Sequence, residues 1–335
     1  MSKAIEMVEL WRGGLLESTH RGHVVIAHAS GDLVKVWGDP ERVIFPRSSA
    51  KMFQALPLVE TGAADAAGLT SAHLALACAS HEGAALHIDM ARSWLQNLGL
   101  SEGDLRCGAH MPYDRDQRDH LIKTDQSPCQ FHNNCSGKHA GFLTATRHMG
   151  ADAEYNQIDH PLQIAIRAAF EDATDQAVAG WGIDGCSAPN FATTMAAFAR
   201  GAAQFAAAAH AGADSGDARA RAMARLTRAM AQNPLLVAGE GRACSELMQA
   251  MGGRVAIKTG AEAVYVGIIP DMQLGIAVKI EDGNTRASEA AMVALLVRLG
   301  VLDGANPAAQ KRLPAAQINW RGLRTGELRL AQEFS

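Results

Sequence analysis

Strand-forming segments stand at both ends of this chain and bracket a long helical middle. The first strand candidates are Val8–Leu10, His23–His28 and Leu33–Trp37, which Gly and Asp turns separate. The later strand candidates are 254–258, 263–269 and 274–280, with a hairpin turn at 270–272. Because neither group can bury a sheet face alone, we expect one antiparallel sheet that is assembled from the two termini.

The middle of the chain is predicted to be mainly helical. After Pro46 the apolar residues recur with helical spacing, and Pro57 is expected to kink that helix or to end its regular hydrogen bonding. The Ala- and Arg-rich stretch 196–232 predicts two helices that are split at 211–217. We interpret this composition as helix propensity rather than as a binding surface.

We expect a single domain over residues 1–335 with two lobes. The sheet lobe combines 1–45 with 250–335, and the mainly helical lobe covers 46–249. A closing helix is predicted from Asn284, a good N-cap, to Gly300, a good C-cap residue. The expected fold class is therefore α+β (α/β mixed), with an antiparallel sheet from both termini and a helical middle region.

Composition narrows the classes of function. The net charge of −4 gives no basic field for nucleic acid or for an anionic membrane. No run of about 18 apolar residues predicts a transmembrane helix. Glu6 interrupts the N-terminal segment too early for a signal peptide. The six cysteines are scattered without a C-x-x-C motif, so reduced thiols in a cytoplasmic protein are expected.

Two short motifs are typical of the serine penicillin-recognising enzymes. Ser48 and Lys51 form S-x-x-K at a predicted helix start, and Lys258-Thr259-Gly260 forms K-T-G at the end of a predicted strand. Residues three apart on a helix share one face, so Lys51 can reach Ser48 and take its proton when the amine is neutral. A glycine at position 260 lets a substrate or another backbone approach the strand edge. The alternative is a plain N-cap serine beside solvated lysines.

The S-x-N tripeptide that usually stands between these two motifs is missing. The nearest substitutes begin at Ser80 and at Ser136. This departure argues against a true β-lactamase or transpeptidase.

A metal site is a further possibility raised by the cysteines. Cys135 and Cys186 could bind a soft metal such as zinc, with a nitrogen from His132, Lys138 or His139. Two distant cysteines rarely suffice for such a site, so the residues alone leave it open.

Six strings along the chain match one family closely. They are R-S-S-A-K from Arg47, F-Q-A-L-P from Phe53, A-S-H-E-G from Ala79, N-C-S-G-K-H from Asn134, D-G-C from Asp184 and I-K-T-G from Ile257. In these strings the chain resembles the rhizobial-type bacterial L-asparaginase II family over about residues 8–330. The resemblance implies a serine β-lactamase-like (penicillin-binding-like) fold, hydrolysis of L-asparagine to L-aspartate and ammonia, and a homodimer.

The resemblance also implies two Ser–Lys pairs in one catalytic site. These pairs fall on Ser48 with Lys51 and on Ser80 with Lys258, so that Ser80 replaces the serine of the missing S-x-N. In the expected mechanism Ser48 attacks the side-chain amide and forms a covalent acyl-enzyme, while Ser80 and Lys258 pass a proton to the leaving amine.

A zinc ion held by Cys135, Lys138 and Cys186 is implied in the same way. The lysine must lose its proton to bind the metal. Zinc is expected to orient the substrate, because a serine already serves as the nucleophile. Three further residues, His139, Asp184 and Cys244, match positions that line the site.

Charge suggests three residues that bind the substrate's α-substituents. Arg47 is predicted to bind the α-carboxylate, and Asp184 or Glu82 the α-ammonium group. The nearest alternative functions are a glutaminase, a D-amino-acid peptidase or another serine amidohydrolase or esterase of this fold. A non-catalytic, zinc-stabilised binding protein is the alternative from another class, although it would not need both serines and both lysines.

Overall fold

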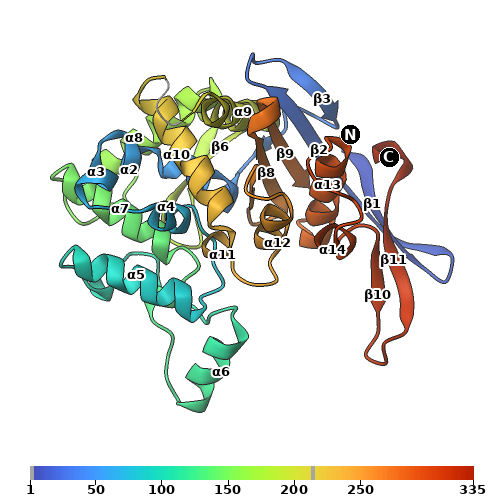
Figure 1. Cartoon of the computed structure of the whole chain (residues 1–335), viewed down its shortest axis with the longest axis horizontal. Coiled ribbons are helices and arrows are strands. Elements are labelled where there is room, and N and C mark those ends of the chain that lie inside the picture. The colour runs from blue at the N-terminus through green and yellow to red at the C-terminus, as the bar shows by residue number, and fades with distance from the viewer. Residues whose placement is uncertain (1–3, 213–215) are drawn as a thin grey trace.

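A large antiparallel sheet dominates the computed structural model, which describes residues 4–212 and 216–335 (Figure 1). Within these residues, eight strands follow the order β10-β11-β1-β2-β9-β8-β7, and β3 pairs with β2. Their bounds are β1 (Ile5–Arg12), β2 (Leu15–His28), β3 (Leu33–Trp37), β7 (Ala256–Thr259), β8 (Val264–Ile269), β9 (Leu274–Ile280), β10 (Ala315–Ile318) and β11 (Arg324–Leu330). The N-terminal strands β1 and β2 lie side by side between the C-terminal strands β11 and β9, which confirms the predicted α+β class.

The register shows how closely the termini are joined. Val8 of β1 pairs with Leu330 of β11, and Val24 of β2 pairs with Val278 of β9. Every residue of β8 is buried, so helices cover both faces of the sheet centre. The hairpin of β10 and β11 was not predicted, because its exposed strands mix polar and apolar residues without a clear buried face.

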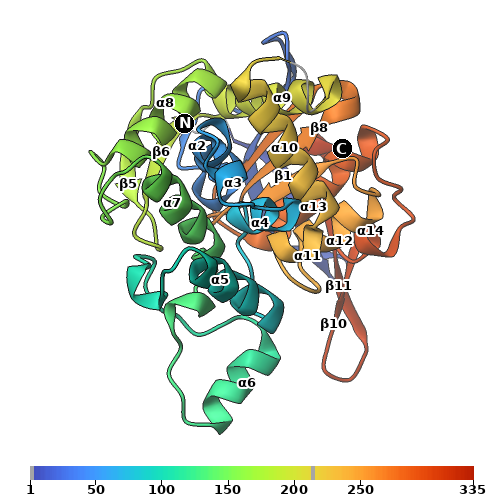
Figure 2. The ribbon, with the colours of Figure 1, turned by 60° about the vertical axis from the view of Figure 1, so that its left-hand side comes forward.

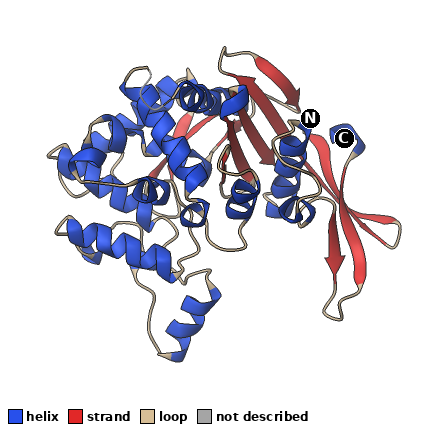
Figure 3. Cartoon of the chain, in the orientation of Figure 1, coloured by secondary structure: helices blue, strands red, loops and turns tan. Residues whose placement is uncertain are grey.

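Most helices lie to the left of the sheet in Figure 3, while α9 and α13 pack directly on β8 and β9. Their bounds are α1 (Lys51–Gln54), α2 (Leu56–Glu60), α3 (Ala63–Ala66), α4 (Ser71–Ala77), α5 (Ala85–Asn97), α6 (Arg115–Lys123), α7 (Ser136–His148), α8 (Pro161–Thr174), α9 (Met195–Ala211), α10 (Ala218–Gln232), α11 (Pro234–Val237), α12 (Ala243–Ala250), α13 (Thr285–Arg298) and α14 (Pro307–Gln310). Among the described residues, no helix is both long and apolar enough to cross a membrane.

The Ala-rich composition of α9 has a packing reason. A Cβ atom on Gly275 of β9 would lie 2.1 Å from the backbone oxygen of Ala199 and 2.3 Å from the nitrogen of Ala203. The helix backbone therefore rests directly on the strand, which only small side chains permit. The predicted pair of helices is confirmed as α9 and α10, although residues 213–215 of the predicted split lie outside the described residues.

The middle of the chain is less regular than a run of helices. The helix after Pro46 is interrupted between α1 and α2, with Pro57 in the first turn of α2, as its missing N–H predicts. The segment is not helical throughout, because the described chain also has a three-stranded sheet here. Its strands are β4 (Val43–Ile44), β6 (Pro189–Thr194) and β5 (Gly180–Ile183).

The predicted closing helix is confirmed as α13. Asn284 accepts a hydrogen bond from the backbone N–H of Arg286 and caps α13, and Gly300 follows the helix with φ of 70°. Helix α6 lies apart from the other helices on extended loops in both views of the ribbon (Figure 2).

Candidate active site

The S-x-x-K motif lies in a tight turn that enters α1. Residues Arg47–Ala50 form a 3₁₀ turn, and Lys51 begins the α-helix. Arg47 has φ of 54°, a left-handed conformation that costs free energy for a residue with a Cβ atom. Its guanidinium holds Asp184 through Nε at 2.9 Å and Nη2 at 2.7 Å, which helps to fix this strained backbone beside Ser48.

Lys51 points to the second serine of the site. Its buried ammonium nitrogen donates to the hydroxyl of Ser80 at 2.9 Å and also to the backbone oxygen of Ala79. The sequence had paired Lys51 with Ser48, yet no hydrogen bond of the Ser48 hydroxyl is found within residues 4–212 and 216–335. Lys51 therefore connects the S-x-x-K turn to Ser80 directly.

Ser80 lies on an irregular segment that neighbouring loops hold in place. Its backbone N–H donates to Val237 at 2.9 Å, and the N–H of His81 donates to Asn134 at 3.1 Å. The imidazole of His81 is 3.0 Å from the hydroxyl of Ser136 at the start of α7. The segment needs these contacts because it has no helix or strand of its own to satisfy its backbone groups.

Lys258 is the next-to-last residue of β7 and is fully buried. Its amine donates to the backbone oxygen of Thr259 at 2.7 Å, where the sequence had paired it with Ser80. Burial lowers the pKa of Lys258 to about 7, and the nearby charges of Lys51 and Arg242 act in the same direction. A large fraction of this lysine is therefore neutral at physiological pH and can accept a proton.

Gly260 joins the K-T-G strand end to the S-x-x-K turn. A Cβ atom at this position would lie 2.5 Å from the backbone oxygen of Pro46 and 3.1 Å from the nitrogen of Ser49. The prediction that this glycine allows a second backbone to approach is confirmed. The two motifs, about two hundred residues apart, are thus in direct contact.

Cys244 lies behind the same strand end. Its sulfur accepts a hydrogen bond from the backbone N–H of Thr259 at 3.3 Å and lies 3.4 Å from the hydroxyl of Tyr265. Both polar groups are buried, so Cys244 fixes the strand beside Lys258.

The three residues expected to hold zinc come together in the structure. The amine of Lys138 lies 3.0 Å from the sulfur of Cys186, and the nearby thiol of Cys135 donates to the side-chain oxygen of Asn134 at 3.1 Å. Cys135, together with Lys138, lowers the pKa of Cys186 despite its burial. Burial alone would lower the pKa of Lys138, but the two cysteines raise it. In the described part of the chain, no three His, Cys, Asp or Glu side chains form such a group, so a metal here would need the lysine.

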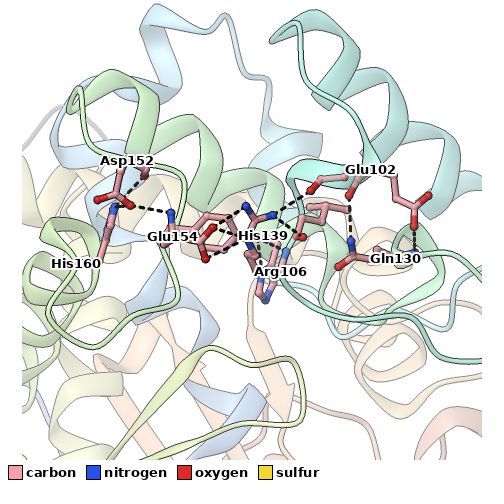
Figure 4. Close-up of polar contacts among 10 residues, drawn as sticks. Glu102, Arg106, Gln130, His139, Asp152, Glu154 and His160 are labelled. Atoms are coloured by element: carbon pink, nitrogen blue, oxygen red, sulfur yellow. Dashed lines mark hydrogen bonds and ion pairs between the residues drawn. The ribbon is translucent and has the colours of Figure 1, made fainter.

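His139 follows Lys138 on α7 and is fully buried. Its Nδ1 lies 2.9 Å from the hydroxyl of Tyr155, which also accepts the backbone N–H of Arg106 at 2.7 Å. Burial lowers the pKa of His139, so the ring is neutral. Figure 4 shows His139 beside the ion pair of Arg106 and Glu154, which joins the loops around α7. No sequence pattern predicts this contact between Tyr155 and His139.

The residues predicted to bind substrate have partners within the protein. Arg47 and Asp184 hold each other, and an oxygen of Asp184 also accepts the N–H of Gly185 at 2.7 Å. Glu82 accepts the backbone N–H of Glu240 at 2.8 Å, and burial raises the pKa of this carboxyl. All three side chains lie near the serines but are already engaged.

A cleft of about 370 Å³ opens beside the S-x-x-K turn. Arg47 lines it from one side, and Asn190 and Glu262 line it from others. Its volume is sufficient for a small amino-acid amide. Neither serine and neither lysine of the site lines this cleft, which touches the site through Arg47.

Solved structures with similar overall shape are all distant in sequence. A putative beta-lactamase from Bacteroides dorei is 13% identical, with 84% of this chain and 93% of that chain covered and a TM-score of 0.45. The protein Mglu is 13% identical, with 87% and 69% covered and a TM-score of 0.40. A beta-lactamase from Mycobacterium bovis is 13% identical, with 83% and 94% covered and a TM-score of 0.38. With TM-scores below 0.5, these structures assign no function to the chain.

Comparison of the sequence with protein families says more about function than the structural comparison does. No curated protein matches it. The family model for L-asparaginase II matches residues 8–330, nearly the whole chain and every residue of the site described above. The protein thus belongs to the L-asparaginase II family and is an amidohydrolase of that family.

Proposed function

We propose that the protein is an L-asparaginase, which hydrolyses L-asparagine to L-aspartate and ammonia through a serine nucleophile. The observation that carries this proposal is the buried hydrogen bond from Lys51 to Ser80, next to a second buried lysine. A serine hydroxyl needs a base near it, and Lys258 has a pKa of about 7 because of its burial. The site thus offers two hydroxyls and an amine that can take a proton.

In the first step the Ser48 hydroxyl attacks the side-chain amide carbon of asparagine. Its proton passes to the lysine amines, and the new C–O bond gives a tetrahedral oxyanion. Lys51 and Ser80 share a hydrogen bond, so they form a path along which that proton reaches the departing nitrogen. Collapse breaks the C–N bond, releases ammonia and leaves an ester on Ser48.

In the second step a water molecule attacks this ester. A neutral lysine accepts the water's proton, and Ser48 leaves with a proton returned to its oxygen. The products are aspartate and the free enzyme. Both steps require one lysine to be neutral and the other to supply positive charge near the oxyanion.

Zinc fits the donor set of Cys135, Lys138 and Cys186. Two thiols and an amine are ligands that this metal accepts, once Lys138 has lost its proton. When bound, zinc would supply a positive charge that orients the substrate. The chain's own residues, Ser48 above all, carry out the attack.

The protein is further proposed to act in the cytoplasm as a homodimer. Size-exclusion chromatography with light scattering would test the oligomeric state.

The central experiment measures ammonia release by two neighbouring serine variants. Ser48→Ala is expected to lower kcat by at least ~10³-fold, since triad-type nucleophiles contribute on this scale. Ser49→Ala is the matched control, because its hydroxyl donates to the backbone oxygen of Pro46 at 2.5 Å and should be dispensable. Full activity of Ser48→Ala would refute the scheme. An acyl adduct found on Ser80 by mass spectrometry would exchange the roles of the two serines.

Substrate and metal are tested in the same assay. Asparagine, glutamine and a small ester are compared, and asparagine is expected to have the highest kcat/KM. Metal content is measured for the wild type and for Cys186→Ala, with and without a chelator. One zinc per chain that is lost in Cys186→Ala supports the site, and metal content that is equal in both proteins contradicts it.

A further inference from the structure

We propose that Arg242 binds the α-carboxylate of the substrate, a role that the sequence had given to Arg47. The inference rests on the proposed hydrolysis of an amino-acid amide. It depends on three observations: Arg47 is occupied, Arg242 lies between the two halves of the site, and the guanidinium of Arg242 has no partner among the described residues.

Arg47 is poorly suited to hold a substrate carboxylate. Two of its guanidinium nitrogens, Nε and Nη2, donate to the same carboxylate oxygen of Asp184. The carboxylate of Asp184 is 12% exposed and its guanidinium partner 28% exposed, so the pair is partly desolvated. A substrate would have to break or share this ion pair, and separating such a pair leaves a charge without its partner.

Arg242 is placed by contacts on both of its sides. Before it in the chain, the backbone N–H of Glu240 donates to Glu82, two residues from Ser80. After it, the sulfur of Cys244 accepts the N–H of Thr259, the neighbour of Lys258. Arg242 therefore lies on the short segment that connects the Ser80 side of the site to the Lys258 side.

The backbone of this segment is shaped for close contact. Gly239 has φ of 113°, and a Cβ atom there would lie 2.2 Å from an oxygen of Glu82. Arg242 itself directly precedes α12 as its N-cap residue, with extended backbone. The segment is thus held against Glu82, which limits the positions that the side chain of Arg242 can reach.

The guanidinium of Arg242 is half-buried and uncommitted. Over the described ranges 4–212 and 216–335 it makes no hydrogen bond and no ion pair, although most other half-buried arginines hold a carboxylate. Its positive charge acts to lower the pKa of Glu82, of Glu289 and of Lys258. Glu289 is already bound by Arg312 at 3.2 Å, and Glu82 by a backbone N–H.

A guanidinium that makes no hydrogen bond to the protein keeps its N–H donors for a ligand. Its planar fork suits a carboxylate, which it can bind through two hydrogen bonds. An amino-acid amide brings such a carboxylate to the site, at the end opposite to the reacting amide. Arg242 would then fix the distance between the bound carboxylate and the serines.

The test compares Arg242→Gln with Arg47→Gln in asparagine hydrolysis. Arg242→Gln is expected to raise the KM for asparagine and the Ki for the product-like inhibitors L-aspartate and succinate by about 10- to 100-fold, as for the loss of a charged hydrogen-bond pair, with kcat changed by less than about threefold. Arg242→Lys should restore part of this loss. Arg254→Gln, at an exposed arginine, is the surface control.

A structural role would give a different result. If Arg242 only balances the charge of Glu82, then Arg242→Gln should weaken β-alanine, which is aspartate without its α-carboxylate, as much as it weakens aspartate. Equal effects on the two inhibitors, or an unchanged KM and Ki, overturn the inference. So does a loss of aspartate binding that is confined to Arg47→Gln. A wild type that releases no ammonia from asparagine refutes the proposed function instead, and calorimetry with aspartate still tests Arg242.

Discussion

Lys258→Met should make the protein more stable, by an amount that depends on pH. The lysine is fully buried, and burial lowers its pKa from 10.5 to about 7. The unfolded chain therefore binds a proton that the folded protein does not bind between pH 7 and pH 10.5. Over this window the wild type gains stability as the pH rises, and below pH 7 it carries the full cost of burying the charge.

The magnitude follows from the difference between the two pKa values. Each pH unit within the window changes the contribution of Lys258 by about 1.4 kcal/mol. Methionine has a similar volume and no charge, so the variant lacks this dependence. Relative to the wild type, Lys258→Met should be favoured by roughly 4 kcal/mol near pH 7 and by roughly 1 kcal/mol near pH 9.5, before any constant cost of the lost hydrogen bond to Thr259.

Urea denaturation at four pH values between 7 and 9.5 provides the assay. The quantity of interest is the difference in unfolding free energy between variant and wild type, because other titrating groups cancel in it. Lys123→Met, at an exposed lysine that ends α6, is the matched control and should show no trend with pH. A difference for Lys258→Met that stays constant across the range would refute a buried, neutral Lys258.

Three other measurements follow from the structure. The kcat/KM for asparagine should rise with pH through about 7, because the proton-accepting form of Lys258 is the neutral one, and a flat stopped-flow or ammonia-release profile would contradict this. Gly260→Ala should lower the activity, and it should lower the free energy of unfolding by about 2 kcal/mol or more, since the new Cβ atom would lie 2.5 Å from the backbone oxygen of Pro46. Unchanged thermal unfolding would disprove this contact. Trp94→Phe removes the 3.0 Å hydrogen bond from the indole to Thr144, and chemical denaturation should show a loss of about 1 kcal/mol or more.

Much of the fold could be predicted because its elements carry local signals. β-branched runs marked β2 and β9, and a capping Asn284 with a closing Gly300 marked α13. The hairpin of β10 and β11 could not be predicted, since its strands face solvent and lack alternation. The small sheet of β4, β5 and β6 also escaped prediction, because β6 is buried throughout and Pro189 begins it.

The structure brings several of the predicted site residues together, but in other pairs than the sequence suggested. Motif spacing suggested that Lys51 faces Ser48, whereas the hydrogen bond of Lys51 runs to Ser80 from another segment. Such a contact depends on how the loop of Ser80 is tied to Val237, which no local pattern encodes. Arg47 was expected to be available to a ligand for the same reason, because its ion pair with Asp184 joins residues far apart in sequence. Tertiary contacts therefore decide the roles of residues that a motif can only name.

The interleaving of the two chain ends in one sheet sets an order of events during synthesis. Val8 has its partner Leu330 only after almost the whole polypeptide has left the ribosome. β2 likewise waits for β9, so the N-terminal hairpin spends that time with unpaired edges, which can pair with another chain. The turn that contains Ser48 is synthesised early, whereas Gly260, which packs against that turn, and Lys258 are synthesised late. A chain truncated before residue 258 therefore lacks the lysine that the proposed hydrolysis uses as its proton acceptor, and such a chain should release no ammonia from asparagine.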